Sequence, residues 1–523
     1  MYRLTLIAAI VLSVLMAACA PLDDFEDDAF FDDEFADEEF VDEEGFEDEP
    51  EAAGPSAENG SFTETACQIE TAGYEATCGF LTVPENRADS ANTNRIDLAV
   101  VVIRAPFGSP EPDPIVYLSG GPGSSALLDF EGDPEGFVES GYMDNRDLIL
   151  VDQRGTGFSE PTLNCPEVEE AEEDQFAAFE ACRDRLVADG VDLAAYNNDE
   201  NANDIADLIT ALGYDQANLY GVSYGTRLAL GVMRDHPEVV RSAVLDSVFP
   251  HDVDVPLDEA PSLIEALEVM YDLCAADAAC NAAYPDLEAR MLQTVAQLDA
   301  APGVDPDGFD VDGAALIDAT YQALFAGADG VPLVPRMIYD ASEGDFNALL
   351  SLYEVVGFTR RAYQDGEDRS DSEGMYHSII CQDEFAFVDV NTAEQQNQAS
   401  LPPELANGAF AGVLDIYDIC TIWDVGQAPA IENQPVVSDI PTLILNGSLD
   451  PATPASWAER AAQTLSSGYY FEFTTGSHSL TSFDACAIDL MAQFFEDPSS
   501  SPDGSCVANA APLEWVLPGD PLP

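Results

Sequence analysis

The chain has 523 residues, and its 100 Asp and Glu residues against 17 Lys and Arg give a formal net charge of −83. Nucleic acids and anionic membrane surfaces are bound through basic patches, so this charge excludes both as partners. The four His residues form no HExxH pair, and we expect neither a metal ion nor a cofactor. Because 46% of the residues are hydrophobic, the chain is able to bury a large core.

The first 18 residues have the pattern of a bacterial export signal. Arg3 precedes an apolar run over 4–15, and the sequence Met16-Ala17-Ala18-Cys19 resembles a lipobox. We expect 1–18 to be removed and Cys19 to carry a lipid; the alternative is an ordinary signal peptide that contains a cysteine. No later run has the apolar length of a membrane-spanning helix, which predicts export with a membrane contact only through that lipid anchor.

Residues 19–60 form a low-complexity acidic segment. Phe25, Phe30, Phe35, Phe40 and Phe46 follow one another at five- or six-residue steps among Asp and Glu. This spacing matches neither a helix nor a strand, and like charges repel one another, so we predict an extended, disordered linker. A docking motif for a partner is the alternative. The acidic excess continues through the rest of the chain, which contains no Lys, and suggests a surface adapted to high salt.

Ten cysteines follow Cys19, an even number that fits disulfides in an exported protein. Sequence alone does not fix their pairing, but four short loops suggest themselves, and the two remaining cysteines would then join each other. The pairs are Cys67 with Cys78, Cys165 with Cys182, Cys274 with Cys280, Cys486 with Cys506, and Cys381 with Cys420. None lies in a CxxC pattern, so we expect structural bridges and no metal ligands.

Short apolar runs alternate with amphipathic stretches along the body of the chain. The runs are 96–103, 115–118, 148–151, 219–222, 243–245, 443–445 and 469–473, and helical patterns occur at 202–212 and 226–235. Such runs are typical of strands buried on both faces of a mostly parallel sheet, which predicts an α/β fold. Between 250 and 435 we expect a helical insertion, with helices at 261–273, 287–298 and 314–324. The core would then consist of 61–249 and 436–523.

The segment 219–225, LYGVSYG, places a G-x-S-x-G motif between a predicted strand and a predicted helix. A tight strand-to-helix turn lifts the serine hydroxyl out of the sheet, and the two glycines leave room for that turn. The pentapeptide also arises by chance, so the alternative is a structural turn. In this context the motif indicates that Ser223 is a nucleophile.

A nucleophilic serine needs a base, and four histidines are available. His236 follows a predicted helix, His251 begins the insertion and His377 lies within it. His478 follows the final predicted strand, and the chain order Ser, acid, His is that of α/β-hydrolases. Elimination and position therefore favour His478.

The acid of such a site would follow a buried strand and a turn. Asp450 comes after the strand 443–445 and an Asn-Gly turn, and would lie where it is able to orient an imidazole. Asp246, after the strand 243–245, is the alternative. We favour Asp450.

A glycine-rich loop, SGGPG at 119–123, follows the strand 115–118. Its main-chain N–H groups, together with that of Tyr224, would stabilise an oxyanion. A phosphate-binding loop is excluded because no Lys follows and no Walker pattern is present. The sequence DQRGTG at 152–157 is interpreted as a structural turn that shapes the same edge.

The ordered set of motifs GGPG, DQRGTG, G-x-S-Y-G-T and a later VLD resembles the prolyl and tripeptidyl aminopeptidases of peptidase family S33. The end of the chain resembles the tripeptidyl group, with an Asp after Asn-Gly, a His near Gly-Ser and a cysteine pair like Cys486 and Cys506. The resemblance spans roughly 62–510. It implies an α/β-hydrolase core, a helical cap and release of residues from peptide N-termini.

The resemblance also implies roles for single residues. Ser223, Asp450 and His478 match the triad, and Gly121 and Tyr224 match the oxyanion donors. The loop opens with Ser119, where the family often has His.

Relatives in this family hold the free amino group of the substrate with cap carboxylates. Asp383 and Glu384, soon after Cys381, match that stretch, and a solvated acidic turn is the alternative. The prediction is thus an exported serine aminopeptidase acting on short peptides. Two alternatives stay open: a carboxylesterase or lactonase on the same triad, and a non-catalytic peptide-binding lipoprotein. The acids at 305–312 lack EF-hand spacing, which disfavours a calcium site.

Overall fold

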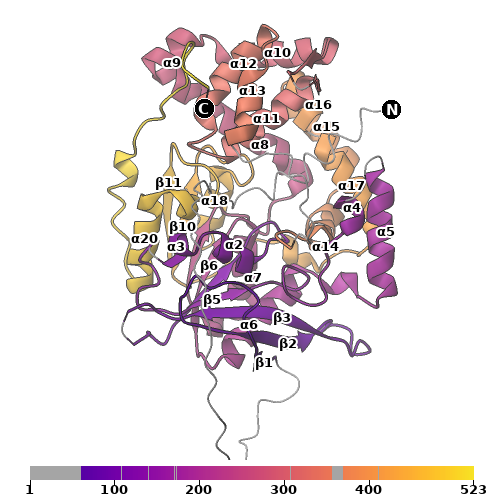
Figure 1. The fold of residues 1–523 in the computed structure, drawn as a ribbon, viewed down its shortest axis with the longest axis vertical. Helices are drawn as coiled ribbons and strands as arrows, with labels where there is room; N and C mark the ends of the chain where they lie inside the picture. The colour runs from indigo at the N-terminus through magenta and orange to yellow at the C-terminus, as the bar shows by residue number, and fades with distance from the viewer. Residues whose placement is uncertain are drawn as a thin grey trace, which may run out of the picture.

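A computed structural model describes residues 60–522, apart from 108, 139, 170, 172–173, 307, 356–368 and 410. The expected signal peptide, the lipid-bearing Cys19 and the acidic linker up to residue 59 lie outside the described residues. Strands from distant parts of the chain form one sheet with the order β1-β2-β3-β5-β4-β6-β7-β10-β11 (Figure 1). Their bounds are β1 Ser61–Glu64, β2 Ala76–Pro84, β3 Arg95–Ile103, β4 Ile115–Leu118, β5 Leu148–Val151, β6 Ala217–Val222, β7 Val240–Asp246, β10 Thr442–Gly447 and β11 Gly468–Phe473.

The centre of the sheet is parallel and buried. From β5 to β11 neighbouring strands run parallel, whereas β1, β2 and β3 form an antiparallel edge. Every residue of β4, β5, β6 and β10 is buried, as expected for strands covered on both faces. The predicted α/β fold is confirmed. The apolar runs did not reveal β1 and β2, because polar residues, Gly79 and Pro84 interrupt the hydrophobic pattern of these edge strands.

Helices pack on both faces of the sheet. One face is covered by α5, α6, α7 and α18, and the other by α2, α3 and α20. The core helices are α2 Ala126–Gly132, α3 Pro134–Val138, α4 Pro166–Glu169, α5 Gln175–Ala188, α6 Asn198–Ala211, α7 Tyr224–Asp235, α18 Ala455–Ala462, α19 Leu480–Phe483 and α20 Ala485–Glu496. Short 3-10 turns occur at Leu193–Ala195, Pro237–Val239, Val331–Leu333, Phe385–Phe387, Ala430–Asn433 and Val507–Asn509.

The insertion after β7 is helical and divides into two groups. The first, with the small β8–β9 hairpin (Gly303–Val304 and Asp310–Val311), has its own hydrophobic cluster and lies above the sheet in Figure 1. It consists of α8 Val255–Ala276, α9 Ala278–Ala283, α10 Leu287–Ala300, α11 Gly313–Phe325, α12 Val334–Ser342 and α13 Asn347–Val355. The second consists of α14 Glu373–Asp383, α15 Val390–Ser400 and α17 Ala411–Trp423, of which α14 and α17 also pack against the core. The short helix α16 Pro403–Ala409 packs on the first group through Leu405.

The last residues of the described chain pack on the cap. Leu513, Trp515 and Val516 contact the hydrophobic cluster of the first helical group. The N–H of Val516 donates to the carbonyl of Pro332 (3.1 Å), and its own carbonyl accepts from the Tyr284 hydroxyl (2.7 Å). Figure 1 shows this segment rising from the side of α20 to the cap. The tail of the segment 436–523, expected in the core, therefore joins the cap.

Five disulfides are formed, and they join the pairs that the short loops suggest. They are Cys67–Cys78, Cys165–Cys182, Cys274–Cys280, Cys381–Cys420 and Cys486–Cys506. Disulfides of this number indicate folding in an oxidising compartment outside the cytoplasm. Across the described residues, the helices are all too short or too polar to cross a membrane.

The charge of the chain leads to a prediction about salt. Self-repulsion of a net charge of −83 opposes the compact state, and counter-ions screen it. Raising NaCl from about 0.05 M to about 2 M is expected to raise the thermal unfolding midpoint by roughly 5 °C or more. Sucrose at equal osmolality is the control for solvent exclusion. An equal rise of the unfolding midpoint in sucrose, or no rise of the midpoint in NaCl, would contradict an electrostatic origin of the effect.

His377 on α14 predicts a loss of stability in acid. Its ring is fully buried among Phe179, Tyr376 and Trp423, and neither nitrogen has a hydrogen-bond partner in the described part of the chain. Burial lowers the pKa of His377 from 6.5 to about 3, so the native state keeps it neutral. The unfolded chain binds a proton below about pH 6.5, so the stabilisation is full above that pH and is lost as the pH falls towards 3.

The expected size of this effect is about 2 kcal/mol between pH 7 and pH 5, because each pKa unit corresponds to roughly 1.4 kcal/mol. His377→Phe keeps an aromatic ring and removes the titration. Urea unfolding of both proteins at the two pH values would show a smaller loss in the variant. Equal losses of stability in the two proteins would mean that the pKa of His377 does not differ between the folded and unfolded states.

Candidate active site

Ser223 occupies the turn between β6 and α7. Its φ of 56° and ψ of −124° lie where residues other than glycine are rarely found. Its N–H donates to the carbonyl of Asp246 (2.9 Å), and its carbonyl accepts from the N–H (2.9 Å) and hydroxyl (2.6 Å) of Thr226. This strained strand-to-helix turn is the geometry that a G-x-S-x-G motif requires, and it leaves Ser223 partly exposed.

The two glycines beside Ser223 are required by backbone contacts. A Cβ on Gly221 would overlap the carbonyl of Gly225, and a Cβ on Gly225 would overlap the carbonyl of Leu118. Backbone atoms do not move aside as a flexible side chain does. Glycine therefore lets α7 begin directly against β4 and β6.

His478 and Asp450 form a buried pair. Nδ1 of His478 lies 2.8 Å from Oδ2 of Asp450, and the Asp450 residue is 0% exposed. The carboxylate also accepts from the N–H groups of Ala452 and Thr453 (2.9 Å each) and from the Thr453 hydroxyl (2.6 Å). These donors hold the carboxylate in one orientation, so that it keeps the proton on Nδ1 and leaves Nε2 as an acceptor.

The three candidate triad residues follow strands that end at one edge of the sheet. Ser223 follows β6, Asp450 follows β10 and His478 follows β11, and all three strands are parallel. The carboxyl ends of parallel strands meet at the same edge. Ser223 and His478 share no hydrogen bond in the described structure, and such bonds are often long before a substrate binds.

The alternatives weighed for the acid and the base lie elsewhere or serve other contacts. Asp246 accepts hydrogen bonds from Leu480 and Thr481, not from the imidazole of His478. His236 contacts Asn203 (3.0 Å). His251 is buried against Arg227 and Glu432 and His377 lies among aromatic rings. The structure thus brings Asp450, and none of these groups, into contact with His478.

The glycine-rich loop lies against the serine. A Cβ on Gly120 would be 3.1 Å from the Cβ of Ser223, so the loop and the elbow touch. Gly121 has φ +101°, a conformation suited to glycine. Neither the N–H of Gly121 nor that of Tyr224 has an acceptor within the described residues. Both N–H groups are therefore free to donate to an oxyanion.

The DQRGTG turn and the α14 segment support this loop. Gln153 donates to the carbonyl of Ser119 (3.2 Å), and Asp152 accepts from the hydroxyl of Ser125 (2.8 Å). The carbonyl of Gly123 accepts from the N–H of Ser372 (3.0 Å), directly before α14. The oxyanion loop is thus held from both the core and the second helical group.

The cap reaches the histidine through α11. The ring of Phe325 stacks on His478, with 4.4 Å between centroids, and Tyr321 stacks on Phe325. The hydroxyl of Ser477 donates to the carbonyl of Leu324. The end of α11 therefore forms one wall of the site.

The structure places Asp383 and Glu384 in a buried polar network. Glu384 is 0% exposed and pairs with Arg227 of α7 (2.6 Å), and Asp383 is 1% exposed and accepts from the N–H of Asn198 (3.2 Å). Burial raises the pKa of Asp383 to about 7 and that of Glu384 to about 8. Neither carboxylate is accessible to a substrate in this packing, and Glu384 already has a cationic partner.

A different cap carboxylate is unpaired. Oε2 of Glu259, on α8, is buried and lacks a hydrogen-bond partner among the described residues. Burial raises the pKa of Glu259 to about 7. Burial raises the pKa of the Tyr321 hydroxyl, and so do the negative charges of Glu259 and Asp450. Tyr321 therefore lies near both Glu259 and Asp450. Asp318 Oδ2 and Asp383 Oδ1 also lack a partner among the described residues. No sequence signal separates Glu259 from so many other acids, because the lack of a partner is a property of the folded chain.

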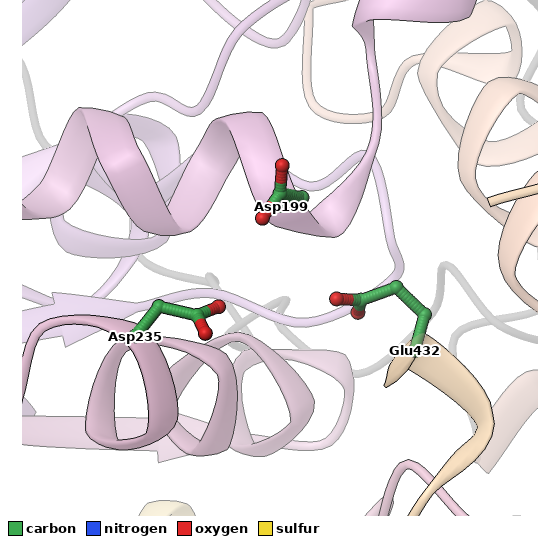
Figure 2. A group of neighbouring side chains, drawn as sticks. All are labelled: Asp199, Asp235 and Glu432. Carbon is green, nitrogen blue, oxygen red and sulfur yellow. The ribbon is translucent and has the colours of Figure 1, made fainter. Parts of the chain in front are cut away.

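Three carboxylates come together beside the C-terminal end of α7. Figure 2 shows Asp199, Asp235 and Glu432 turned towards a common space. Arg234 pairs with both Asp235 and Glu432, and His251 lies 3.3 Å from Glu432. Arg234 therefore gives two of the three carboxylates a cationic partner, and burial lowers the pKa of His251.

The acids at 305–312 serve the local fold. Asp305 accepts from the N–H of Phe309 (2.7 Å) within the β8–β9 turn, and Asp312 accepts from the N–H of Ala315 (3.0 Å) at the start of α11. Both carboxylates therefore stabilise a turn or a helix end.

The comparisons with known proteins agree with this geometry. Residues 113–298 match the model of the alpha/beta hydrolase fold, and residues 409–506 match that of TAP-like proteins. The chain is therefore an α/β hydrolase. Its C-terminal region is similar to that of TAP-like proteins, as the sequence motifs predicted.

Three curated relatives are distant. The serine protease Hip1 of Mycobacterium tuberculosis is 25% identical over 472 residues, covering 82% of this chain and 87% of that protein. The tripeptidyl aminopeptidase of Streptomyces coelicolor is 25% identical over 476 residues, covering 83% and 84%. The proline iminopeptidase of Neisseria gonorrhoeae is 26% identical over 144 residues, covering 27% and 34%.

Proposed function

We propose that this protein is an exported aminopeptidase that releases residues from the N-terminus of short peptides, of the prolyl or tripeptidyl type. The observation that carries the proposal is the strained Ser223 elbow at the same sheet edge as the hydrogen-bonded His478–Asp450 pair. The names of the relatives, a serine protease, a tripeptidyl aminopeptidase and a proline iminopeptidase, support a peptide substrate.

In the proposed reaction Ser223 Oγ attacks the carbonyl carbon of the scissile amide, and Nε2 of His478 takes the hydroxyl proton. Asp450 holds the imidazole through Nδ1 and stabilises the imidazolium. The N–H groups of Gly121 and Tyr224 donate to the oxyanion. His478 then protonates the leaving amine, and water hydrolyses the acyl-enzyme by the same steps.

The free amino group of the substrate would be held by the cap. Asp383 and Glu384 match the family's carboxylates by sequence, but they are buried in the network around Arg227. Asp383 Oδ1 also lacks a hydrogen-bond partner among the described residues, but Asp383 is almost completely buried, whereas Glu259 is only half-buried. Glu259 is therefore the better candidate, because an ammonium group would supply a partner for its unpaired oxygen. This assignment favours exopeptidase action.

The test compares free-amino peptide anilides, the same anilides with a blocked amino group, and a short-chain ester. The mature protein is used with a Ser223→Ala control. Hydrolysis of free-amino anilides alone, lost in the control, is the expected result. Ester hydrolysis without amide hydrolysis would assign an esterase on the same triad. A folded protein that hydrolyses none of the three and resists fluorophosphonate labelling would have a binding role.

Glu259→Gln is expected to raise KM for free-amino substrates roughly 10- to 100-fold, the value of one hydrogen bond to a charged group. KM for blocked substrates should change little. Because the pKa of Glu259 is about 7, the advantage of a free amino group should fall as the pH drops below 7. Glu268→Gln, an exposed change on the same helix, is the control. An equal loss for blocked and free substrates would remove Glu259 from amino-group binding.

We also propose that the protein is attached to the outside of the cell through a lipid on Cys19. The lipobox-like sequence at 16–19 supports the anchor, and the five disulfides support the compartment.

A further inference from the structure

We propose that Asp246 is a positioning residue for His478, because its buried carboxylate fixes the loop that carries the histidine and its charge favours the imidazolium. The inference rests on the proposed triad. Asp246 is not the orienting acid considered from the sequence, since Asp450 occupies that place. It acts instead from the other side of the loop.

The carboxylate of Asp246 collects four donors. Oδ1 accepts from the Ser247 hydroxyl (3.2 Å) and from the N–H of Leu480 (3.1 Å). Oδ2 accepts from the N–H of Thr481 (2.7 Å) and from the Thr481 hydroxyl. The Ser247 hydroxyl in turn accepts from the N–H of Ser479 (2.8 Å). The three residues directly after His478 are therefore all tied to the end of β7.

These bonds hold an unfavourable backbone. Ser479 has φ 57° and Ser247 has φ 61°, both in the left-handed region that a non-glycine residue enters at a cost. Such conformations persist only where surrounding contacts over-determine them. Asp246 supplies those contacts on both sides of the junction between β7 and the His478 loop.

Asp246 also holds the nucleophile. Its main-chain carbonyl accepts from the N–H of Ser223 (2.9 Å). One residue thus fixes the Ser223 turn through its backbone and the His478 loop through its side chain. The relative placement of nucleophile and base depends on Asp246 more directly than on the cap.

The contacts also indicate the charge of Asp246. Its residue is 0% exposed, and burial raises its pKa while the donors from Thr481 and Leu480 oppose that rise. Two of the four donors are main-chain N–H groups, which only donate, and hydrogen bonds of this kind favour the anion. No Arg pairs with Asp246 within the described residues, and its titratable neighbour is His478.

This second anion has a consequence for catalysis. When His478 takes the proton of Ser223, the imidazolium contacts Asp450 and also interacts with the charge of Asp246. An adjacent anion favours the protonated imidazole. Removing the charge should therefore destabilise the imidazolium as well as loosen the placement of the ring.

The experiment follows fluorophosphonate labelling of Ser223 between pH 4 and pH 9, which needs no knowledge of the natural substrate. Asp246→Asn is expected to lower the plateau rate roughly 10- to 100-fold, as loss of an outer partner of a functional histidine does. The pH at which labelling is half-maximal should fall by about one unit. Asp484→Asn, which changes a carboxylate capping α20, should alter neither value.

Thr481→Val and Thr481→Ser keep the charge and separate it from positioning. The valine variant loses one hydrogen-bond donor to Asp246. Its labelling should be several-fold slower, while the half-maximal pH should not move. The serine variant keeps the hydroxyl and should recover the labelling rate. These variants also serve if Asp246→Asn does not fold.

Three outcomes would overturn the inference. An unchanged labelling rate in folded Asp246→Asn would exclude a positioning role. A lower labelling rate, with an unmoved half-maximal pH and a lower thermal unfolding midpoint, would show that Asp246 is merely structural. No labelling of the wild type would overturn the proposed function and this inference with it.

Discussion

Asp450→Asn is expected to lower kcat by roughly four orders of magnitude while the fold is kept. The carboxylate accepts from Nδ1 of His478, and its other oxygen accepts from the N–H groups of Ala452 and Thr453. An amide of the same shape keeps the latter bonds, but its NH2 group faces Nδ1. The imidazole then carries its proton on Nε2, where it is unable to accept the proton of Ser223.

The measurement is kcat for the best free-amino substrate, together with circular dichroism to verify the fold. Asp439→Asn, an exposed change shortly before β10, is the control and should leave kcat unchanged. A loss below about tenfold would contradict the role of Asp450.

Arg227→Met is expected to destabilise the protein by about 3–5 kcal/mol, because it leaves the buried Glu384 carboxyl and two buried carbonyls without their donor. The guanidinium is 0% exposed and bonds to Glu384 and to the carbonyls of Asp383 and Glu432. It also lies over the ring of Phe249 (4.9 Å). The pair joins α7, which starts at the nucleophile, to the end of α14.

Urea unfolding of the variant and of Arg227→Met/Glu384→Gln measures this effect. The double variant should recover part of the loss, since the buried carboxyl that lost its partner is gone. Arg460→Met is the control, because its pair with Asp252 is half-exposed (47% for the Arg460 side chain) and should cost less than about 1 kcal/mol. Equal losses for Arg227→Met and Arg460→Met would show that burial of the pair is not decisive.

The predicted helices show how far periodicity reaches. The pattern at 287–298 corresponds to α10 (Leu287–Ala300), and that at 314–324 to α11 (Gly313–Phe325). Their apolar spacing is a local property. The ends of the helices are set by caps, such as the Asp312 side chain that accepts from Ala315.

The division of the insertion into two packing groups was not predictable in this way. The helices α11 and α14 both carry buried apolar residues, yet one packs within the cap and the other partly against the core. Which surface covers an amphipathic face depends on the path of the chain, not on the face itself.

The sequence by itself determined the class of fold and the strand-to-helix turn that carries Ser223, because buried parallel strands and a strand–GxSxG–helix turn are local patterns with few other interpretations. It also singled out His478 from four histidines. The tertiary structure decided the roles of the acids. Among 100 Asp and Glu residues, chain position does not tell which carboxylate contacts an imidazole, which pairs with a buried arginine and which stays unpaired. Asp450, Glu384 and Glu259 differ in these respects through neighbours that only folding brings together.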